Sequence, residues 1–144
     1  MDVLRRRSHR AAVAAALVAV AAAGCSGPGD GEAADVVSRF YAAVESGDGE
    51  AACALLLPGA ADDLAHEAGA PCAEAVLDPA DVGGVLAERA TGAAVDAVHR
   101  AGGQAQVVTE SDTVFLARSG ATWVVTAVGC DERGERPYDC EVES

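Results

Sequence analysis

The sequence has no lysine, one methionine and, within 144 residues, only five aromatic side chains: Phe40, Tyr41, Phe115, Trp123 and Tyr138. Alanine and valine supply most of the 51% hydrophobic content. Each of these small side chains buries a modest apolar area, which contributes roughly 25 cal/mol per Å². We therefore expect one domain, in which covalent cross-links contribute to stability.

Basic residues are scarce beyond the first ten positions. That stretch holds one acid, Asp2, and four of the ten arginines: Arg5, Arg6, Arg7 and Arg10. Without residues 1–24, six arginines face 22 acids, and the formal charge changes from −13 to −16. A domain this acidic repels phosphate backbones, so nucleic acid is not an expected partner.

The first 24 residues contain the parts of an export signal in the usual order. Basic residues at 5–10 precede an apolar run of 13 residues, Ala11–Ala23, and small residues stand at the end. A bilayer-spanning helix needs about 20 apolar residues, so this run is too short for a permanent anchor. We interpret residues 1–24 as an export signal, and both the general and the twin-arginine export routes stay open.

A cysteine, Cys25, directly follows the signal. Ala22-Ala23-Gly24-Cys25 resembles the lipobox of bacterial lipoproteins, in which the cysteine thiol receives a diacylglyceryl group. Ala22 stands where that family usually has leucine. The resemblance implies lipidation of Cys25 and an anchor on the outer face of the cytoplasmic membrane, since two or more acyl chains hold a protein there stably. A secreted protein with a free Cys25 and an uncleaved anchor are the alternatives.

The glycine-rich stretch after Cys25 predicts a flexible tether over residues 25–33, followed by a single domain over 34–144. With Cys25 assigned to the lipid, the remaining cysteines are Cys53, Cys72, Cys130 and Cys140. Four cysteines allow three pairings. Closure of short loops favours Cys53 with Cys72 and Cys130 with Cys140. The spacings do not match those of zinc sites, so no metal is expected.

Helical periodicity occupies the first half of this domain. Val36, Val37, Phe40, Tyr41 and Val44 form one apolar stripe that ends at Gly47. The hexapeptide GDGEAA occurs at 29–34 and again at 47–52, and we expect its aspartates to cap two helices. Further helices are predicted at 49–57, which stops at Pro58, and at 60–68, with a helical turn at 72–76. Pro79 and the Gly83-Gly84 pair predict irregular structure over 77–92, although the segment VLAERA at 85–90 can form one or two turns of helix.

After residue 92 the pattern changes to short runs rich in valine and threonine. These runs, at 94–100, 104–110, 113–118 and 121–128, are separated by AGG, SD and SG, which is typical of an antiparallel meander. The segment 137–142 can add a short edge strand held by Cys140. Helices followed by strands predict an α+β fold with a sheet of about four strands.

The pieces DVVSRFYAAVESGDGEAACALLLP, PCAEAV, DTVFLARSGATWVVTAVGC and PYDCEV resemble a group of small actinobacterial lipoproteins related to the NTF2-like or SnoaL-like superfamily. That resemblance implies helices packed on a strongly curved sheet, which together form a cone with a pocket. Within such a cone, strand alternation places Trp123, Val125 and Ala127 on one face, and Tyr41 approaches them from the first helix. Tyr41 and Trp123 are therefore the candidate pocket residues, and the alternative is that Trp123 is simply the main large core residue.

Other side chains that could act in catalysis or bind metal lack the sequence neighbours that such a site needs. His66 and His99 have only ordinary acidic neighbours, Asp112 precedes a strand where turn chemistry explains an aspartate, and the acid-rich tail lacks calcium-loop spacing. No catalytic motif is present, so no catalytic residue and no cofactor are assigned. We expect a non-enzymatic, lipid-anchored extracytoplasmic domain that binds a small ligand or an envelope protein. The alternative is an enzyme of the isomerase or hydrolase type, with a carboxylate or histidine in the cone.

Overall fold

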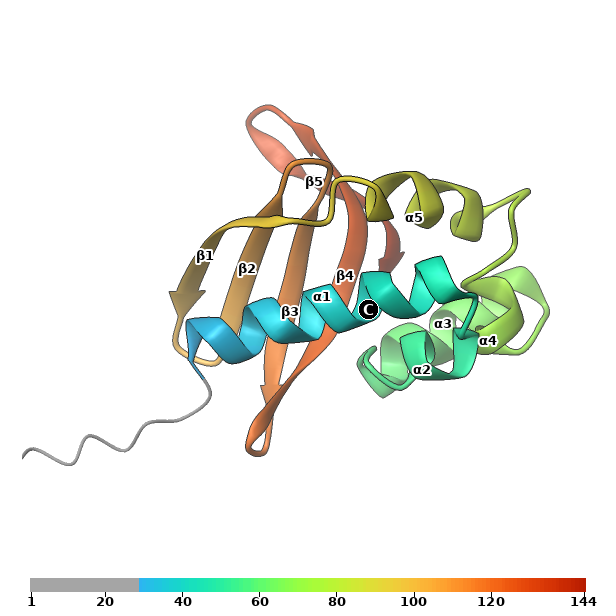
Figure 1. Ribbon diagram of the computed structural model, residues 1–144, viewed down its shortest axis with the longest axis horizontal. Helices are drawn as coiled ribbons and strands as arrows, with labels where there is room; N and C mark the ends of the chain where they lie inside the picture. Colours follow the sequence, from blue (N-terminus) through green and yellow to red (C-terminus); the bar gives the residue numbers. More distant parts are fainter. Residues whose placement is uncertain (1–28) are drawn as a thin grey trace, which may run out of the picture.

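The computed structural model describes residues 29–144, and the predicted signal peptide, residues 25–28 of the tether and Cys25 itself lie outside them. Five helices come first: α1 (Asp30–Ser46), α2 (Gly49–Cys53), α3 (Pro58–Ala68), α4 (Cys72–Ala75) and α5 (Val82–Ala90). Five strands follow: β1 (Val95–Ala101), β2 (Gln104–Thr109), β3 (Thr113–Ser119), β4 (Thr122–Arg133) and β5 (Arg136–Glu143). The fold is α+β, with the helices N-terminal to the sheet (Figure 1).

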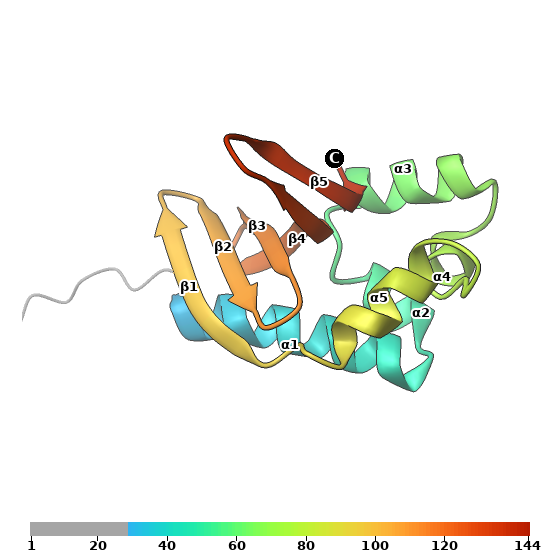
Figure 2. The same cartoon turned by 90° about the horizontal axis from the view of Figure 1, so that it is seen from above.

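The strands form one antiparallel meander in the order β1-β2-β3-β4-β5. The sheet thus has five strands instead of about four, because the C-terminal segment pairs with β4 over most of its length. β1 and β5 are the two edges, so the sheet is not closed, and its curvature is weaker than the predicted cone requires. Figure 2 shows α1 along one face of the sheet and α3 beside β5.

The core lies between α1 and the sheet. Its largest side chains are fully buried and come from α1, from α5 and from the inward face of the strands: Val36, Val37, Phe40, Tyr41, Leu86, Val107, Val114, Leu116, Trp123, Val125 and Val128. Every residue of this core and both disulfides lie between Ala33 and Val142. These residues, all within the described range 29–144, hold the helices against the sheet.

Helix α1 begins earlier than the predicted tether allows. Its N-cap is Gly29, whose backbone N–H donates to Glu32 Oε2 at 2.7 Å. Asp30, expected as the cap, is instead the first helical residue and pairs with Arg100 of β1. The second copy of the hexapeptide behaves as predicted, because Asp48 Oδ1 caps α2 by accepting from the Ala51 N–H at 3.0 Å.

Helix α2 ends at Cys53, four residues before the predicted position, because the chain that follows pairs with the sheet. Leu57 N–H donates to Val125 O at 2.7 Å, and Val125 N–H donates to Leu55 O at 2.9 Å. Pro58 then starts α3 instead of only ending α2. A proline is well placed in the first helical turn, where its missing N–H has no intrahelical partner in any case.

The glycine pair of the expected irregular segment lies inside helix α5. An added Cβ at Gly83 would stand 2.2 Å from Leu77 C, and one at Gly84 would stand 2.6 Å from Pro79 O. The two glycines therefore allow the helix to contact the backbone that precedes it. The helical turns expected at 85–90 are present in α5. The irregular structure expected at the glycine pair is wrong, because these glycines serve close packing and do not break the helix.

A bulge in β4 changes which side chains face the core. Leu116 pairs with Val125 but the adjacent Phe115 pairs with Ala127, so β4 contains one extra residue at this point. Trp123 and Val125 stay on the buried face, and Val128 takes the next buried position. Ala127 is turned away from them, contrary to simple alternation.

Candidate functional site

Asp112 is the most densely bonded polar side chain of the core. It precedes β3, is only 5% exposed, and its carboxylate accepts four hydrogen bonds. Oδ1 accepts from the backbone N–H of Thr113 at 2.8 Å and of Cys130 at 2.7 Å. Oδ2 accepts from the Gly129 N–H at 3.0 Å and from the Tyr41 hydroxyl.

This arrangement depends on the irregular part of β4. Gly129 has φ +70°, a left-handed conformation that brings its N–H and that of Cys130 toward the same carboxylate. Tyr41 reaches the group from α1 and is 1% exposed. Burial, followed by the negative charge of Asp112 and the hydrogen bond to it, raises the pKa of Tyr41 far above its usual value. Tyr41 therefore stays a proton donor to Asp112.

Arg89 binds to the β2–β3 turn, in which Asp112 lies. Its Nη1 donates to Ser111 O at 2.5 Å, and Ser111 Oγ donates back to Arg89 O at 2.5 Å. Its Nη2 donates to Asp131 Oδ1 at 2.8 Å, which is an ion pair with a largely exposed carboxylate. Helix α5, the β2–β3 turn and β4 are thus joined at one place.

The chemistry of the Asp112 cluster is structural in character. A carboxylate has about four lone-pair sites, and here each oxygen already accepts from two donors. A general base needs a free lone pair within reach of its substrate. Asp112 therefore works as an anchor between α1 and β4 in this conformation.

The candidate pocket residues are both in the core. Tyr41 binds Asp112, and Trp123 is 1% exposed with no hydrogen-bond partner for its Nε1 within the described residues. Neither residue lines the three cavities described below. The alternative interpretation of Trp123, as the main large core residue, agrees with this position. Of the two histidines considered, His66 is exposed on α3, and His99 is exposed on β1 beside one of the cavities.

One cavity of about 470 Å³ lies among α3, α4 and the chain leading into α5. We call it the helical hollow. Its apolar lining consists mainly of small side chains: Leu64, Ala68, Ala70, Ala73, Ala75, Leu77, Pro79 and Val82. Its acidic lining residues are Glu74, Asp78 and Asp81, all exposed. The scarcity of large apolar residues, visible in the sequence, leaves this space unfilled.

Two smaller cavities, of about 230 and 240 Å³, adjoin each other on the face of the sheet opposite α1. Both are lined by Gln104, Ala105 and Phe115. His99 and Gln106 belong to the first cavity, and Thr126 belongs to the second. We call the pair the sheet groove.

The four cysteines of the described region form two disulfides. Cys53 joins Cys72, which links α2 to α4, and Cys130 joins Cys140, which links β4 to β5. This is the pairing that short-loop closure favours. Disulfides persist in oxidising compartments, so they indicate an extracytoplasmic domain.

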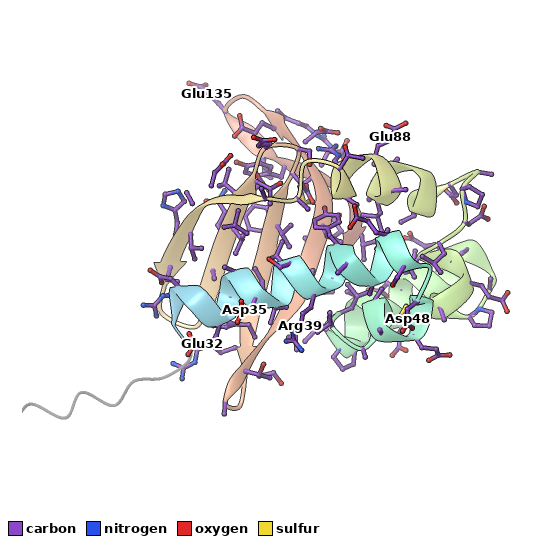
Figure 3. All side chains as sticks on the ribbon, viewed as in Figure 1. Glu32, Asp35, Arg39, Asp48, Glu88 and Glu135 are labelled. Carbon is purple, nitrogen blue, oxygen red and sulfur yellow. A yellow bond between two sulfur atoms is a disulfide. The ribbon has the colours of Figure 1, made fainter. Side chains whose placement is uncertain are left out.

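Acidic side chains cover much of the outside. Figure 3 shows Asp35 on α1, Glu88 on α5 and Glu135 at the tip of the β4–β5 hairpin, each pointing away from the body of the protein. Within residues 29–144, no group of three or more His, Cys, Asp or Glu side chains is arranged to hold a metal ion. In the same region, no helix has both the length and the apolar character needed to cross a bilayer.

Comparison with known proteins adds no assignment: no family model, no curated protein and no solved structure matches the chain. The function therefore has to be argued from the geometry. Sequence reasoning missed the Asp112 cluster and both kinds of cavity. The one local signal for the cluster was Gly129, because a glycine inside a strand often marks a bend or a close approach of another group.

Proposed function

We propose that the chain is a lipid-anchored, extracytoplasmic binding domain that holds a small ligand in the helical hollow. The observation that carries the proposal is the hollow itself. Its volume of about 470 Å³ falls within the range of roughly 300–1,000 Å³ that small-molecule sites occupy. The export signal and lipobox pattern before Cys25 support the anchor, and the two disulfides support the compartment.

The lining limits the kind of ligand. Alanine, leucine and valine side chains offer an apolar surface, which favours a compact hydrocarbon body. Glu74, Asp78 and Asp81 surround it with negative charge, and the chain as a whole carries −13. A carboxylate or phosphate ligand is repelled by that field. The ligand we propose is apolar in its body and neutral or positively charged at its polar end.

The Cys53–Cys72 disulfide supports a preformed site. It attaches α4, which supplies Ala73, Glu74 and Ala75 to the lining, to α2. A wall held by a covalent link changes shape less when a ligand enters, so less conformational entropy is lost on binding. Ligand binding in the hollow therefore does not require the helices to order first.

The proposal does not use the cone that the resemblance to the NTF2-like superfamily implies. Between α1 and the sheet, where that cone would have its pocket, Phe40, Tyr41 and Trp123 fill the space. The alternative of an isomerase or hydrolase needs a titratable group open to a cavity. The buried carboxylate nearest to that description, Asp112, has both oxygens occupied by donors, so the geometry favours a binding function.

The test uses three probes with the same apolar body and different charge: 1-adamantylammonium, 1-adamantanol and adamantane-1-carboxylate. We expect saturable NMR shifts of amides in α3, α4 and the start of α5 for the first two and much weaker shifts for the carboxylate. Ala68→Leu should reduce the affinity, because Ala68 lines the hollow and is exposed, so the larger side chain does not disturb the core.

Ala87→Leu is the matched control. Ala87 is also an exposed helical alanine, but it does not line the hollow. Equal effects of the two substitutions, or shifts that never saturate with any probe, would contradict a site in the hollow. Preferential binding of the carboxylate would contradict the proposed ligand class.

A further inference from the structure

We propose that the sheet groove is a second binding site, and that its ligand is a neutral, hydroxyl-rich ring of the saccharide class. The first observation is the position of the aromatic side chains. Phe40, Tyr41 and Trp123 are in the core, whereas Phe115 and Tyr138 are only partly buried. Register places Phe115 opposite Gln106, on the face of the sheet that α1 does not cover.

Phe115 stands at the junction of the two cavities and lines both of them. Tyr138, from β5, packs against it edge to face, with ring centroids 5.0 Å apart and an interplanar angle of 69°. The Tyr138 hydroxyl accepts from Gln106 Nε2 at 3.2 Å and donates to Glu132 Oε1 at 3.0 Å. The aromatic pair is thus held in place by hydrogen bonds at its rim.

The polar lining excludes a purely apolar ligand. A glutamine amide has two N–H donors and a carbonyl acceptor, and the contact with Tyr138 uses only one donor of Gln106. Gln104, His99 and Thr126 also line the groove. A hydrocarbon over these groups would remove their water without replacing its hydrogen bonds, which costs about 1–3 kcal/mol for each group left unpaired.

The charges of the groove lining and of the whole chain limit the charge that the ligand can carry. The groove has no acidic side chain in its lining, and its one arginine, Arg100, pairs with Asp30. The lining thus differs from that of the helical hollow, which has three acidic side chains. An anion is repelled by the −13 charge of the whole chain. A neutral ligand with many hydrogen-bonding groups remains.

The ring geometry distinguishes a saccharide from a flat heterocycle. A planar base binds best in a slot between two parallel faces, and the 69° angle between Phe115 and Tyr138 makes no such slot. A pyranose needs only one aromatic surface under its C–H face, while its hydroxyls lie at the edge, where amides reach them. Phe115 flanked by Gln104 and Gln106 provides that combination.

The test is an NMR titration of the protein beginning at residue 26, which includes every residue that the structure describes. The probes are chitotetraose, maltotetraose and adenosine, each raised to about 20 mM, enough to reveal a Kd near 1 mM. We expect at least one saccharide to give saturable shifts at the amides of residues 104–106 and 115–117. Absence of saturation with both saccharides, or tighter binding of adenosine at these amides, would overturn the proposal.

Two substitutions test the residues named. Phe115→Leu keeps an apolar side chain of similar size but removes the aromatic face, and we expect about three- to tenfold weaker binding. Gln104→Ala, on an exposed side chain, should weaken binding by about two- to tenfold. Thr122→Ala, also exposed on the sheet but outside the groove, should leave the affinity unchanged. A loss of affinity no larger in the first two variants than in Thr122→Ala would contradict the site.

One variant distinguishes failure of the proposed site in the helical hollow from failure of the proposed site in the sheet groove. Ala68→Leu changes the helical hollow and leaves the lining of the sheet groove unaltered. Saccharide shifts that persist in that variant belong to the groove. Saccharide shifts that disappear in it, or that map to α3 and α4, would assign the ligand to the hollow and overturn the inference about the groove.

Discussion

Tyr41 and Asp112 are 71 positions apart in the sequence, and the hydroxyl of the first donates to the carboxylate of the second in the buried core. The same carboxylate accepts from the backbone of Gly129 and Cys130. One side chain therefore connects α1, the β2–β3 turn and the part of β4 at Gly129 and Cys130. Cys130, at the end of this connection, continues to β5 through its disulfide with Cys140.

Replacing the carboxylate by an amide should destabilise the fold. In Asp112→Asn only one oxygen remains, and the new NH₂ group faces backbone N–H donors that keep no acceptor. We expect a loss of about 2–4 kcal/mol in the free energy of unfolding, measured by urea denaturation. Asp131→Asn is the control, because Asp131 pairs with Arg89 near the surface, and it should cost less than about 1 kcal/mol. Similar losses in both variants would show that the Asp112 cluster is not an anchor.

The hydrogen bond of Tyr41 should make the stability of the fold depend on pH in the alkaline range. Because its pKa is raised in the folded state, the unfolded chain loses the phenolic proton first, near pH 10. The stabilising contribution is therefore complete below about pH 10 and declines above it. Between about pH 10 and 11 we expect the unfolding free energy of the wild type to fall by about 1 kcal/mol more than that of Tyr41→Phe. Parallel pH curves for the two proteins would contradict the buried hydrogen bond.

Substitutions at Gly129 and Gly134 should distinguish the cost of backbone strain from the cost of a steric clash, because the two glycines have nearly the same backbone conformation. Gly129 has φ +70° and Gly134 has φ +69°. A Cβ at Gly129 would lie 3.0 Å from the Glu141 side chain, whereas a Cβ at Gly134 would meet nothing within 4 Å. Gly134→Ala should cost about 1–2 kcal/mol for the left-handed backbone alone, and Gly129→Ala should cost more. The comparison is made by thermal unfolding, and a larger loss at Gly134 would argue against the packing described for β4.

The lipid anchor rests on one residue. Cys25→Ser removes the thiol that would receive the diacylglyceryl group, so we expect the protein to move from the membrane fraction to the soluble or secreted fraction. Metabolic labelling with a fatty acid should be lost in the same variant. Cys53→Ser with Cys72→Ser is the control, since it removes two cysteines that form a disulfide and leaves the proposed acceptor intact. Unchanged membrane association of Cys25→Ser would mean that the lipobox interpretation is wrong.

Part of the architecture was accessible from local patterns. The stripe from Val36 to Val44 is the buried face of α1, and the turns AGG, SD and SG between valine-rich runs separate β1, β2, β3 and β4. These features depend on residues within a few positions of one another, so periodicity is enough to find them. The short-loop disulfide pairing belongs to the same class, because each pair closes within 19 residues or fewer.

Other features needed contacts across the fold. Gly83 and Gly84 suggest irregular structure until the backbone of residues 77–79 is seen against them. Asp112 suggests a simple turn residue until the Tyr41 hydroxyl and the backbone N–H groups of Gly129 and Cys130 are seen to bond to its carboxylate. The sheet groove exists because register places Phe115 beside Gln106, and β5 brings Tyr138 to both.

The sequence by itself determined the order of helices and strands and the acidic charge. It also showed an odd number of cysteines, five, with Cys25 as the one next to the signal. Each of these depends on composition or on short-range spacing. Only the tertiary structure decided that Tyr41 and Trp123 fill the core, that Asp112 anchors it, and that the hollows lie among the helices and on the outer sheet face. The physical reason is that burial and hydrogen-bond partners are set by segments tens of residues apart, whose meeting no local pattern specifies.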